Sequence, residues 1–151
     1  MGTVKVRDDI IHSAKIIIYK TEDHERLYLI VQEPEGIWGF VGGAEDVKDK
    51  DLQKTATREI QEEIGLTPLS YDLKSSNVTY EFVHTDPQSP RYKKKGILHA
   101  YTAEYNAKEP INLNPELIKY EWQPRAEVIK KLTDSYPYLI EVFQKVVDLF
   151  E

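Results

Sequence analysis

Residues 38–66 read WGFVGGAEDVKDKDLQKTATREIQEEIGL, and this stretch carries the densest placement of carboxylates in the chain. Residues three and four apart share one face of an α-helix, so a helix here would project Glu59, Glu62 and Glu63 into one small volume. A cation would relieve their mutual repulsion, and carboxylate oxygens suit hard divalent ions such as Mg²⁺ or Mn²⁺. The stretch therefore predicts a metal site for phosphate chemistry.

The alternative interpretation is an acidic helix face in solvent, and the flanking residues argue against it. Gly42 and Gly43 precede the predicted helix and would let a backbone carbonyl approach a metal without an intervening side chain. Gly65 stands where a C-terminal cap belongs, and Ile60 and Ile64 form a separate apolar face. The pattern indicates a helix with one buried face and one acidic face next to a glycine turn.

Residues 58–66 resemble the C-terminal part of the Nudix box, the motif of hydrolases that cleave nucleoside diphosphates linked to another group. The fixed positions of its REUXEEXGU segment, where U is a bulky aliphatic residue, are filled by Arg58, Glu59, Ile60, Glu62, Glu63, Gly65 and Leu66. Upstream, the positions of an expected glutamate and glycine hold Lys50 and Ala44. Counting from Gly43 instead puts Asp49 at the glutamate position, with one extra residue before the arginine. We therefore expect a one-residue insertion in this loop and a Lys50 side chain outside the metal's coordination shell.

The resemblance implies a Mg²⁺- or Mn²⁺-dependent pyrophosphohydrolase with the α/β/α sandwich of that family. The expected metal-binding residues are Glu59, Glu62, Glu63, Glu116, and a carbonyl of Gly42 or Gly43. Arg58 would orient Glu59 through a charge-assisted contact, and either Glu59 or Glu116 would take the proton of the attacking water. Glu59, Glu62, Arg58 and Glu116 are therefore the expected catalytic residues.

Residues 115–122, PELIKYEW, resemble a segment of Nudix relatives that cleave diadenosine tetraphosphate or nucleoside triphosphates. In those relatives a glutamate shortly before a tryptophan holds metal or activates water, and here the pair would be Glu116 and Trp122. The alternative is a loop glutamate in solvent. The resemblance favours a dinucleoside polyphosphate as substrate, followed by a nucleoside or dihydroneopterin triphosphate. A hypothesis of another class is a catalytically weak Nudix-fold sensor that binds a nucleotide, and the complete set of motif glutamates argues against it.

The segment 84–96, HTDPQSPRYKKKG, gathers basic residues on an otherwise acidic chain. Basic side chains opposite a carboxylate cluster would suit a polyphosphate, and a tyrosine could stack on a base. The candidate substrate-binding residues are Arg91, Tyr92, Lys93, Lys95 and, from the preceding strand, Tyr80. A run of solvated charges is the equally weighted alternative.

The composition is that of a mildly acidic globular protein, with a formal net charge of 20 − 26 = −6 over 151 residues. This charge argues against general nucleic-acid binding. The absence of cysteine excludes disulfides, a thiolate nucleophile and a zinc site built on sulfur. No apolar run approaches the roughly 20 residues that span a bilayer, and no signal-peptide core is present. We expect one cytoplasmic domain over residues 1–151 that acts on a small nucleotide and not at a membrane.

Apolar and β-branched runs predict strands at residues 13–19, 27–32, 37–41, 69–73, 78–83, 97–105 and 118–122, of which the first two should form a hairpin. Helices are predicted at about 52–64 with Asp51 as N-cap, at 125–132 and at 137–150. The pattern indicates an α+β fold with a mixed sheet between helices. We expect Trp38 to pack in the core and His99 to be a structural rather than a catalytic histidine.

Overall fold

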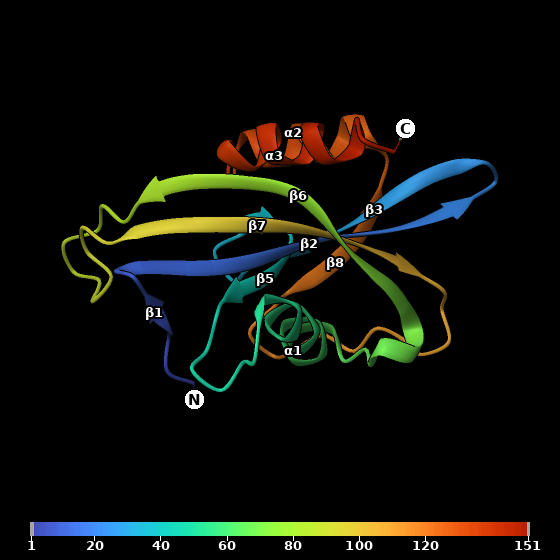
Figure 1. The fold of residues 1–151 in the computed structure, drawn as a ribbon. Helices are drawn as coiled ribbons and strands as arrows, with labels where there is room; N and C mark the ends of the chain where they lie inside the picture. The colour runs from blue at the N-terminus through green and yellow to red at the C-terminus, as the bar shows by residue number, and fades with distance from the viewer. Residues whose placement is uncertain (1, 151) are drawn as a thin grey trace.

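The computed structural model describes residues 2–150 and shows one mixed sheet with helices on both faces (Figure 1). The main path of the sheet follows the order β4-β3-β2-β7-β6, while β1 and β5 also pair with β2, and β8 pairs with β3. β2 runs parallel to β7 and antiparallel to β3. The elements are β1 (Val6–Arg7), β2 (Ile10–Glu22), β3 (Glu25–Gln32), β4 (Trp38–Gly39), β5 (Val41–Ala44), α1 (Leu52–Ile64), β6 (Tyr71–Val83), β7 (Lys95–Tyr105), β8 (Lys119–Gln123), α2 (Arg125–Thr133) and α3 (Tyr138–Val147).

The sheet separates two hydrophobic cores. α1 covers one face of the sheet, and α2 and α3 cover the other (Figure 1). Successive side chains of a strand point to opposite faces, so Ile16 and Ile18 of β2 pack on the α1 side while Ile17 packs on the α2 and α3 side. On that second side, the Phe143 ring of α3 meets the Tyr28 ring edge-on, with 5.0 Å between centroids. The predicted sandwich of a mixed sheet between helices is confirmed.

α1 begins and ends at the residues predicted from its caps. The Asp51 carboxylate accepts a 2.9 Å hydrogen bond from the Lys54 amide. Gly65 has a φ of 72°, a left-handed conformation that glycine adopts without steric cost. Ile60 and Ile64 are fully buried. Beside this apolar face, Glu59 and Glu63 lie on a neighbouring stripe of the helix, against the glycines of β5.

Three predicted strands differ from the observed ones. Residues 37–41 are divided between β4 and the first residue of β5, and these two strands hydrogen-bond to β3 and β2 respectively. Residues 69–73 and 78–83 belong mainly to one strand, β6, which begins at Tyr71 after a 3₁₀ turn at Pro68–Ser70. A bulge between Ser75 and Val78, with Asn77 at a φ of 61°, accommodates the polar residues between the two apolar runs. The polar interruption therefore bends the strand without ending it.

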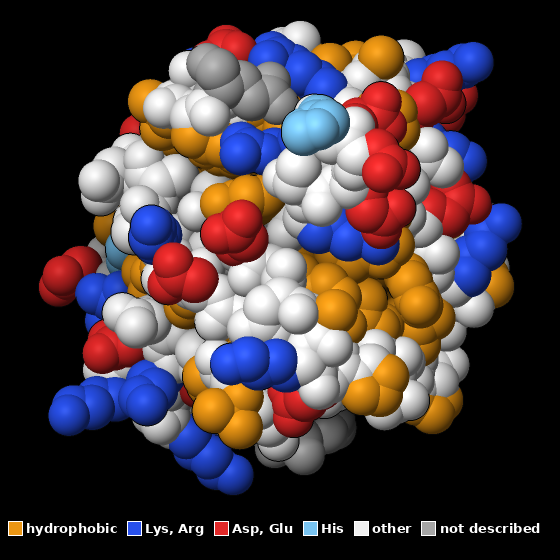
Figure 2. All heavy atoms as spheres, turned by 90° about the vertical axis from the view of Figure 1, so that its right-hand side faces the viewer, with side chains coloured by type: hydrophobic (Ala, Val, Ile, Leu, Met, Phe, Trp, Pro, Cys, Tyr) orange, Lys and Arg blue, Asp and Glu red, His pale blue; other side chains and the backbone are white. Residues whose placement is uncertain are grey.

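Figure 2 shows the end of the molecule on which the β2–β3 hairpin lies. Acidic and basic side chains are interspersed there around an area of hydrophobic side chains. This face carries no field of a single sign. No helix within residues 2–150 is long and apolar enough to cross a membrane.

Candidate functional site

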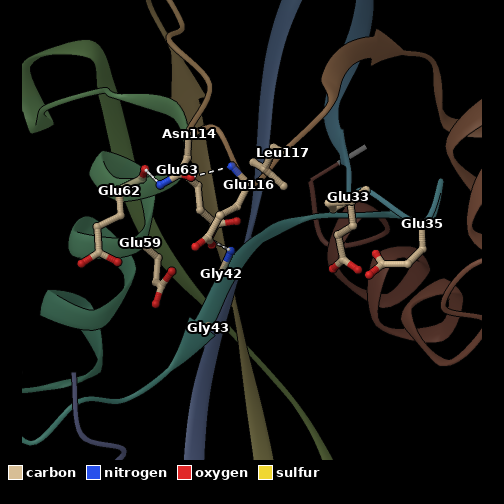
Figure 3. A pocket seen from close by; sticks show the side chains of 11 residues that line it. Glu33, Glu35, Gly42, Gly43, Glu59, Glu62, Glu63, Asn114, Glu116 and Leu117 are labelled. Carbon is tan, nitrogen blue, oxygen red and sulfur yellow. Dashed lines mark hydrogen bonds between the residues drawn. The ribbon is translucent and has the colours of Figure 1, made fainter. Parts of the chain in front are cut away.

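A cavity of about 480 Å³ opens between the C-terminal half of α1, the glycines of β5 and the loop before β8. Its lining is strongly acidic and consists of Glu33, Pro34, Glu35, Gly42, Gly43, Glu59, Glu62, Glu63, Asn114, Glu116 and Leu117. In Figure 3, Glu59 and Glu62 project from α1 on one side, Glu63 and Glu116 lie near the centre, and Glu33 and Glu35 lie on the opposite side. The fold thus brings together all the residues that the sequence nominates as metal ligands. We refer to this space as the acidic cavity.

The two glycines are required by the close approach of β5 to its neighbours. A β-carbon at position 43 would lie 2.5 Å from Oε1 of Glu59, well inside van der Waals contact. A β-carbon at position 42 would lie 2.1 Å from the Ala14 carbonyl oxygen on β2. The Gly42 amide donates a 3.0 Å hydrogen bond to Oε2 of Glu63. A side chain at position 43 would therefore fill the space in which the Glu59 carboxylate meets the strand.

The glutamates of the acidic cavity are short of positive charge. Burial raises the pKa of Glu63 above its ordinary value and the adjacent Glu59 carboxylate raises it further, against the opposing effects of Lys15 and the Gly42 amide. Within residues 2–150, no three His, Cys, Asp or Glu side chains are gathered closely enough to form a ready-made metal centre. The donor set still fits a hard divalent cation, because it consists of carboxylate oxygens whose repulsion such an ion would relieve.

Arg58 connects the motif glutamates to the loop before the helix. Its Nη1 donates to Oε1 of Glu59 at 3.0 Å and to Oε2 of Glu62 at 3.1 Å. Its Nε and Nη2 form a bidentate pair with Asp49, both bonds being 2.9 Å long. The guanidinium group thus holds the Glu59 carboxylate in place, and the Asp49 carboxylate in turn holds the guanidinium group.

Asp49 fixes the position of the Arg58 guanidinium group. Its side chain is 6% exposed and also accepts hydrogen bonds from the Asp46 amide and the Thr55 hydroxyl. Burial alone would raise the pKa of Asp49, but the hydrogen bonds from Arg58, Asp46 and Thr55 lower it to about 2. Lys50 does not line the acidic cavity. The aspartate therefore reaches the arginine from the loop between β5 and α1.

The loop that carries Glu116 is fastened to the end of α1 by Asn114. The Asn114 amide donates to the Glu63 carbonyl at 2.9 Å, and its Nδ2 donates to the Glu62 carbonyl at 3.2 Å. Its Oδ1 accepts a 2.8 Å bond from the Glu116 amide. Asn114 therefore satisfies carbonyls that a helix end leaves free and holds Glu116 at the cavity.

Glu33, Glu35 and Asn114 line the cavity and are missing from the residues nominated by sequence. The Tyr136 hydroxyl donates to the two carboxylate oxygens of Glu33, at 2.9 and 3.0 Å. The sequence does carry a local signal for Glu33 and Glu35. Both belong to the EPEG turn, which follows a strand and precedes the glycines, so they lie at the same end of the sheet as the motif. The hydrogen bond from Tyr136 to Glu33 has no such signal in the sequence, because 103 positions separate the two residues.

Arg91 is the predicted substrate-binding residue that shares a hollow with a motif glutamate. It lines a smaller hollow of about 190 Å³ together with Glu59 and Arg58. Its guanidinium group forms no hydrogen bond or ion pair to other residues in the described part of the chain. By contrast, Lys95 is paired with Glu81 at 2.9 Å.

The other predicted substrate-binding residues lie elsewhere. Tyr92 and Lys93 are exposed, and the Lys93 ammonium lies 5.4 Å from the centre of the Tyr92 ring. Tyr80 packs with the core on the α2 and α3 side, where it stacks on Tyr138 with 5.2 Å between centroids. None of these three lines the acidic cavity.

The remaining aromatic candidates have structural surroundings. Trp38 is 6% exposed and belongs to the core beneath α2 and α3, as expected. Trp122 stacks on Tyr105 with 5.6 Å between centroids. His99 lies outside the acidic cavity and shares a 2.9 Å hydrogen bond with His12.

Comparison with known proteins gives one family and a common fold. Residues 11–144 match the model of the NUDIX domain. No curated protein matches significantly. Among solved structures, an Ap4A hydrolase from C. elegans in a binary complex has a TM-score of 0.74 and 18% identity, with 92% of this chain and 96% of that chain covered.

Two further structures have the same fold. The dihydroneopterin triphosphate pyrophosphohydrolase of E. coli has a TM-score of 0.69 and 17% identity, with 97% of this chain and 95% of that chain covered. The NUDIX domain of Shewanella oneidensis NrtR, solved with ADP ribose, has a TM-score of 0.65 and 19% identity, with 91% and 88% covered. At these identities the likeness shows the fold. Together with the match over residues 11–144, it shows that the chain belongs to the Nudix hydrolase family.

Proposed function

We propose that this Nudix hydrolase is a Mg²⁺-dependent pyrophosphohydrolase, with Mn²⁺ as a possible substitute, and that its substrate is a dinucleoside polyphosphate such as diadenosine tetraphosphate. Nudix hydrolases generally use divalent cations, and the acidic cavity is the observation that carries the proposal. Glutamates from α1 and from the loop before β8 converge there on two glycines, and their charge is only partly compensated. Such a cavity repels a bare polyphosphate, so it can take one only together with cations.

Glu59, Glu62, Glu63 and Glu116 would hold the cation, with a carbonyl of Gly42 or Gly43. A bound divalent ion neutralises phosphate oxygens and lowers the pKa of a water molecule. In the reaction, the water oxygen forms a bond to phosphorus, the P–O bond of the bridge breaks, and the leaving phosphate keeps the electron pair. Glu59 or Glu116 accepts the proton of the water.

Arg58 has a positioning role in this proposal. Its 3.0 Å bond to Glu59 and its bidentate pair with Asp49 restrict the Glu59 carboxylate to one orientation. Arg91, which lines a hollow with Glu59 and has no carboxylate partner in the described part of the chain, is suited to a phosphate oxygen of the substrate. Tyr92 and Lys93 remain candidates for contact with a distal part of the substrate.

Support for the substrate class comes from the Glu116 and Trp122 segment and from the likeness in fold to an Ap4A hydrolase. Fold likeness is an analogy and not a site argument. The likeness to a dihydroneopterin triphosphate pyrophosphohydrolase favours a nucleoside or pteridine triphosphate as the second candidate. A nucleotide sensor of low activity is the candidate of another class, and the NrtR domain solved with ADP ribose has the same fold.

A substrate panel tests the proposal. Diadenosine tetraphosphate, nucleoside triphosphates, dihydroneopterin triphosphate and ADP-ribose are incubated with the protein and Mg²⁺, Mn²⁺ or EDTA, and the nucleotide and phosphate products are counted. We expect cation-dependent cleavage with the highest kcat/KM for diadenosine tetraphosphate. Tight nucleotide binding without turnover of any compound would contradict the enzyme and support the sensor.

A further inference from the structure

A second concavity of about 670 Å³ lies on the far side of Glu62 from the acidic cavity. The loop before α1 and the outer face of α1 form it, and its charged lining residues are Lys48, Asp49, Lys50, Lys54, Arg58 and Glu62. We call it the lysine hollow. Glu62 lines both spaces, and its side chain is 54% exposed, so it stands at the boundary between them.

The lysine hollow carries unpaired positive charge. Both of its carboxylates, Asp49 and Glu62, are engaged by Arg58. Lys48, Lys50 and Lys54 are exposed and form no ion pair within the described part of the chain. Four cationic and two anionic side chains give the hollow a net charge of 4 − 2 = +2, in a protein with a net charge of −6.

This charge distinguishes the hollow from the basic segment between β6 and β7. There, Lys94 is paired with Asp9 at 3.0 Å and Lys95 with Glu81 at 2.9 Å. An anion that approached these two lysines would have to compete with a carboxylate already in place. An anion that approached the lysine hollow would instead meet ammonium groups that form no ion pair within the described part of the chain.

The hollow also adjoins the proposed site of reaction, because Glu62 lines both spaces. Besides the small hollow that Arg91 lines with Glu59, a substrate whose scissile phosphate lies in the acidic cavity can direct its next phosphates toward Glu33 and Glu35 or past Glu62. The first direction meets more carboxylates, whereas the second leads to three lysines. Charge complementarity selects the second direction for a highly charged bridge.

We propose that Lys48, Lys50 and Lys54 form a subsite for the phosphates of a linear polyphosphate bridge beyond those at the acidic cavity. The inference rests on the proposed pyrophosphohydrolase function and gives that site its selectivity for long bridges. A diphosphate bridge ends before it reaches the hollow, so it gains nothing from these lysines.

The test compares two triple variants with the same change in net charge. Lys48→Ala/Lys50→Ala/Lys54→Ala removes the subsite, and Lys74→Ala/Lys108→Ala/Lys145→Ala removes three lysines outside both cavities. We expect the first variant to raise KM for diadenosine tetraphosphate about tenfold or more, and KM for ADP-ribose by less than about threefold. The second variant should change both values by less than about threefold. Added salt should weaken the wild type on the tetraphosphate more than on ADP-ribose.

A measurement without turnover separates this inference from the proposed function. Inorganic tripolyphosphate is titrated calorimetrically into the wild type and both variants, and only the first variant should bind it about tenfold or more weakly. Equal KM increases on both substrates, or unchanged tripolyphosphate binding in the first variant, would overturn the subsite. If the wild type cleaves no compound of the panel, the proposed function fails. The tripolyphosphate titration alone then decides whether the lysine hollow binds a polyphosphate.

Discussion

At the scale of single residues, the carboxylates near the acidic cavity differ in how far positive charge matches their own. Asp49 is matched, because Arg58 grips both of its oxygens at 2.9 Å. Glu63 is only partly matched, by the Gly42 amide and Lys15, and its pKa is raised by burial and by Glu59. The matched carboxylate stabilises the fold, whereas the partly matched one is the kind of group that a cation would stabilise.

Replacement of Asp49 by asparagine should lower the free energy of unfolding. Because the pKa of Asp49 is lowered from 3.8 to about 2 in the folded state, its ionised form contributes about 2 kcal/mol above pH 4, which is lost as the pH falls toward 2. The gap between wild type and Asp49→Asn in urea unfolding should therefore be largest at pH 7 and should narrow at pH 3. Asp72→Asn, a control at an exposed ion pair, should cost less than about 0.5 kcal/mol. A gap that stays constant with pH would contradict the assignment.

Sequence reasoning found the residues of the site that are adjacent in the chain and missed those that only the fold brings together. Glu59, Glu62 and Glu63 follow from helical spacing, and Glu116 from a family resemblance. Glu33 reaches the same cavity from the turn after β3, and the EPEG pattern marks the end of the sheet on which it lies but not the residues of α1 that it faces. The same limit explains why Arg91 and Lys95 could not be distinguished, since their difference lies in the long-range partner Glu81.

At the scale of elements, a helix or strand could be predicted where the residues that set its bounds lie within its own sequence. The bounds of α1 were predictable because Asp51 and Gly65 cap it from within its own sequence. The two-residue strand β1 was not, because Arg7 is held by a 2.9 Å ion pair with Glu45, a residue 38 positions away and 1% exposed. β6 runs through polar residues because β7 pairs with it along both apolar runs.

The contact between β2 and β7 should make stability depend on pH. Burial lowers the pKa of His12 and His99, with Arg7 adding to the effect, so the folded state favours the neutral rings. The contribution of the two neutral rings to folding stability is complete above the ordinary histidine pKa of 6.5 and is lost as the pH falls below it. We expect the Tm of the wild type to fall more between pH 7.5 and 5.0 than that of His99→Gln. His24→Gln, at an exposed turn, should behave as the wild type. Equal falls in the wild type and His99→Gln would rule out this pair as the source.

At the scale of the whole molecule, the sheet separates the site from much of the stabilising core. α2 and α3 bury Phe143 and Leu139 against one face, while α1 presents its glutamates at the edge of the other face (Figure 1). A charge-removing substitution in the acidic cavity therefore leaves both cores intact. This separation allows activity and stability to be measured independently in one variant.

The most direct test of the central claim is the kcat of Glu62→Gln on the best substrate of the panel at saturating Mg²⁺. The amide keeps the size of the side chain but lacks the charge that binds a hard cation, so kcat should fall by roughly three orders of magnitude or more while Tm changes little. Glu141→Gln, which removes a carboxylate from an exposed ion pair on α3, is the matched control and should keep wild-type turnover. A kcat of Glu62→Gln within about tenfold of the wild type would contradict the assignment of the acidic cavity as the site of metal-dependent hydrolysis.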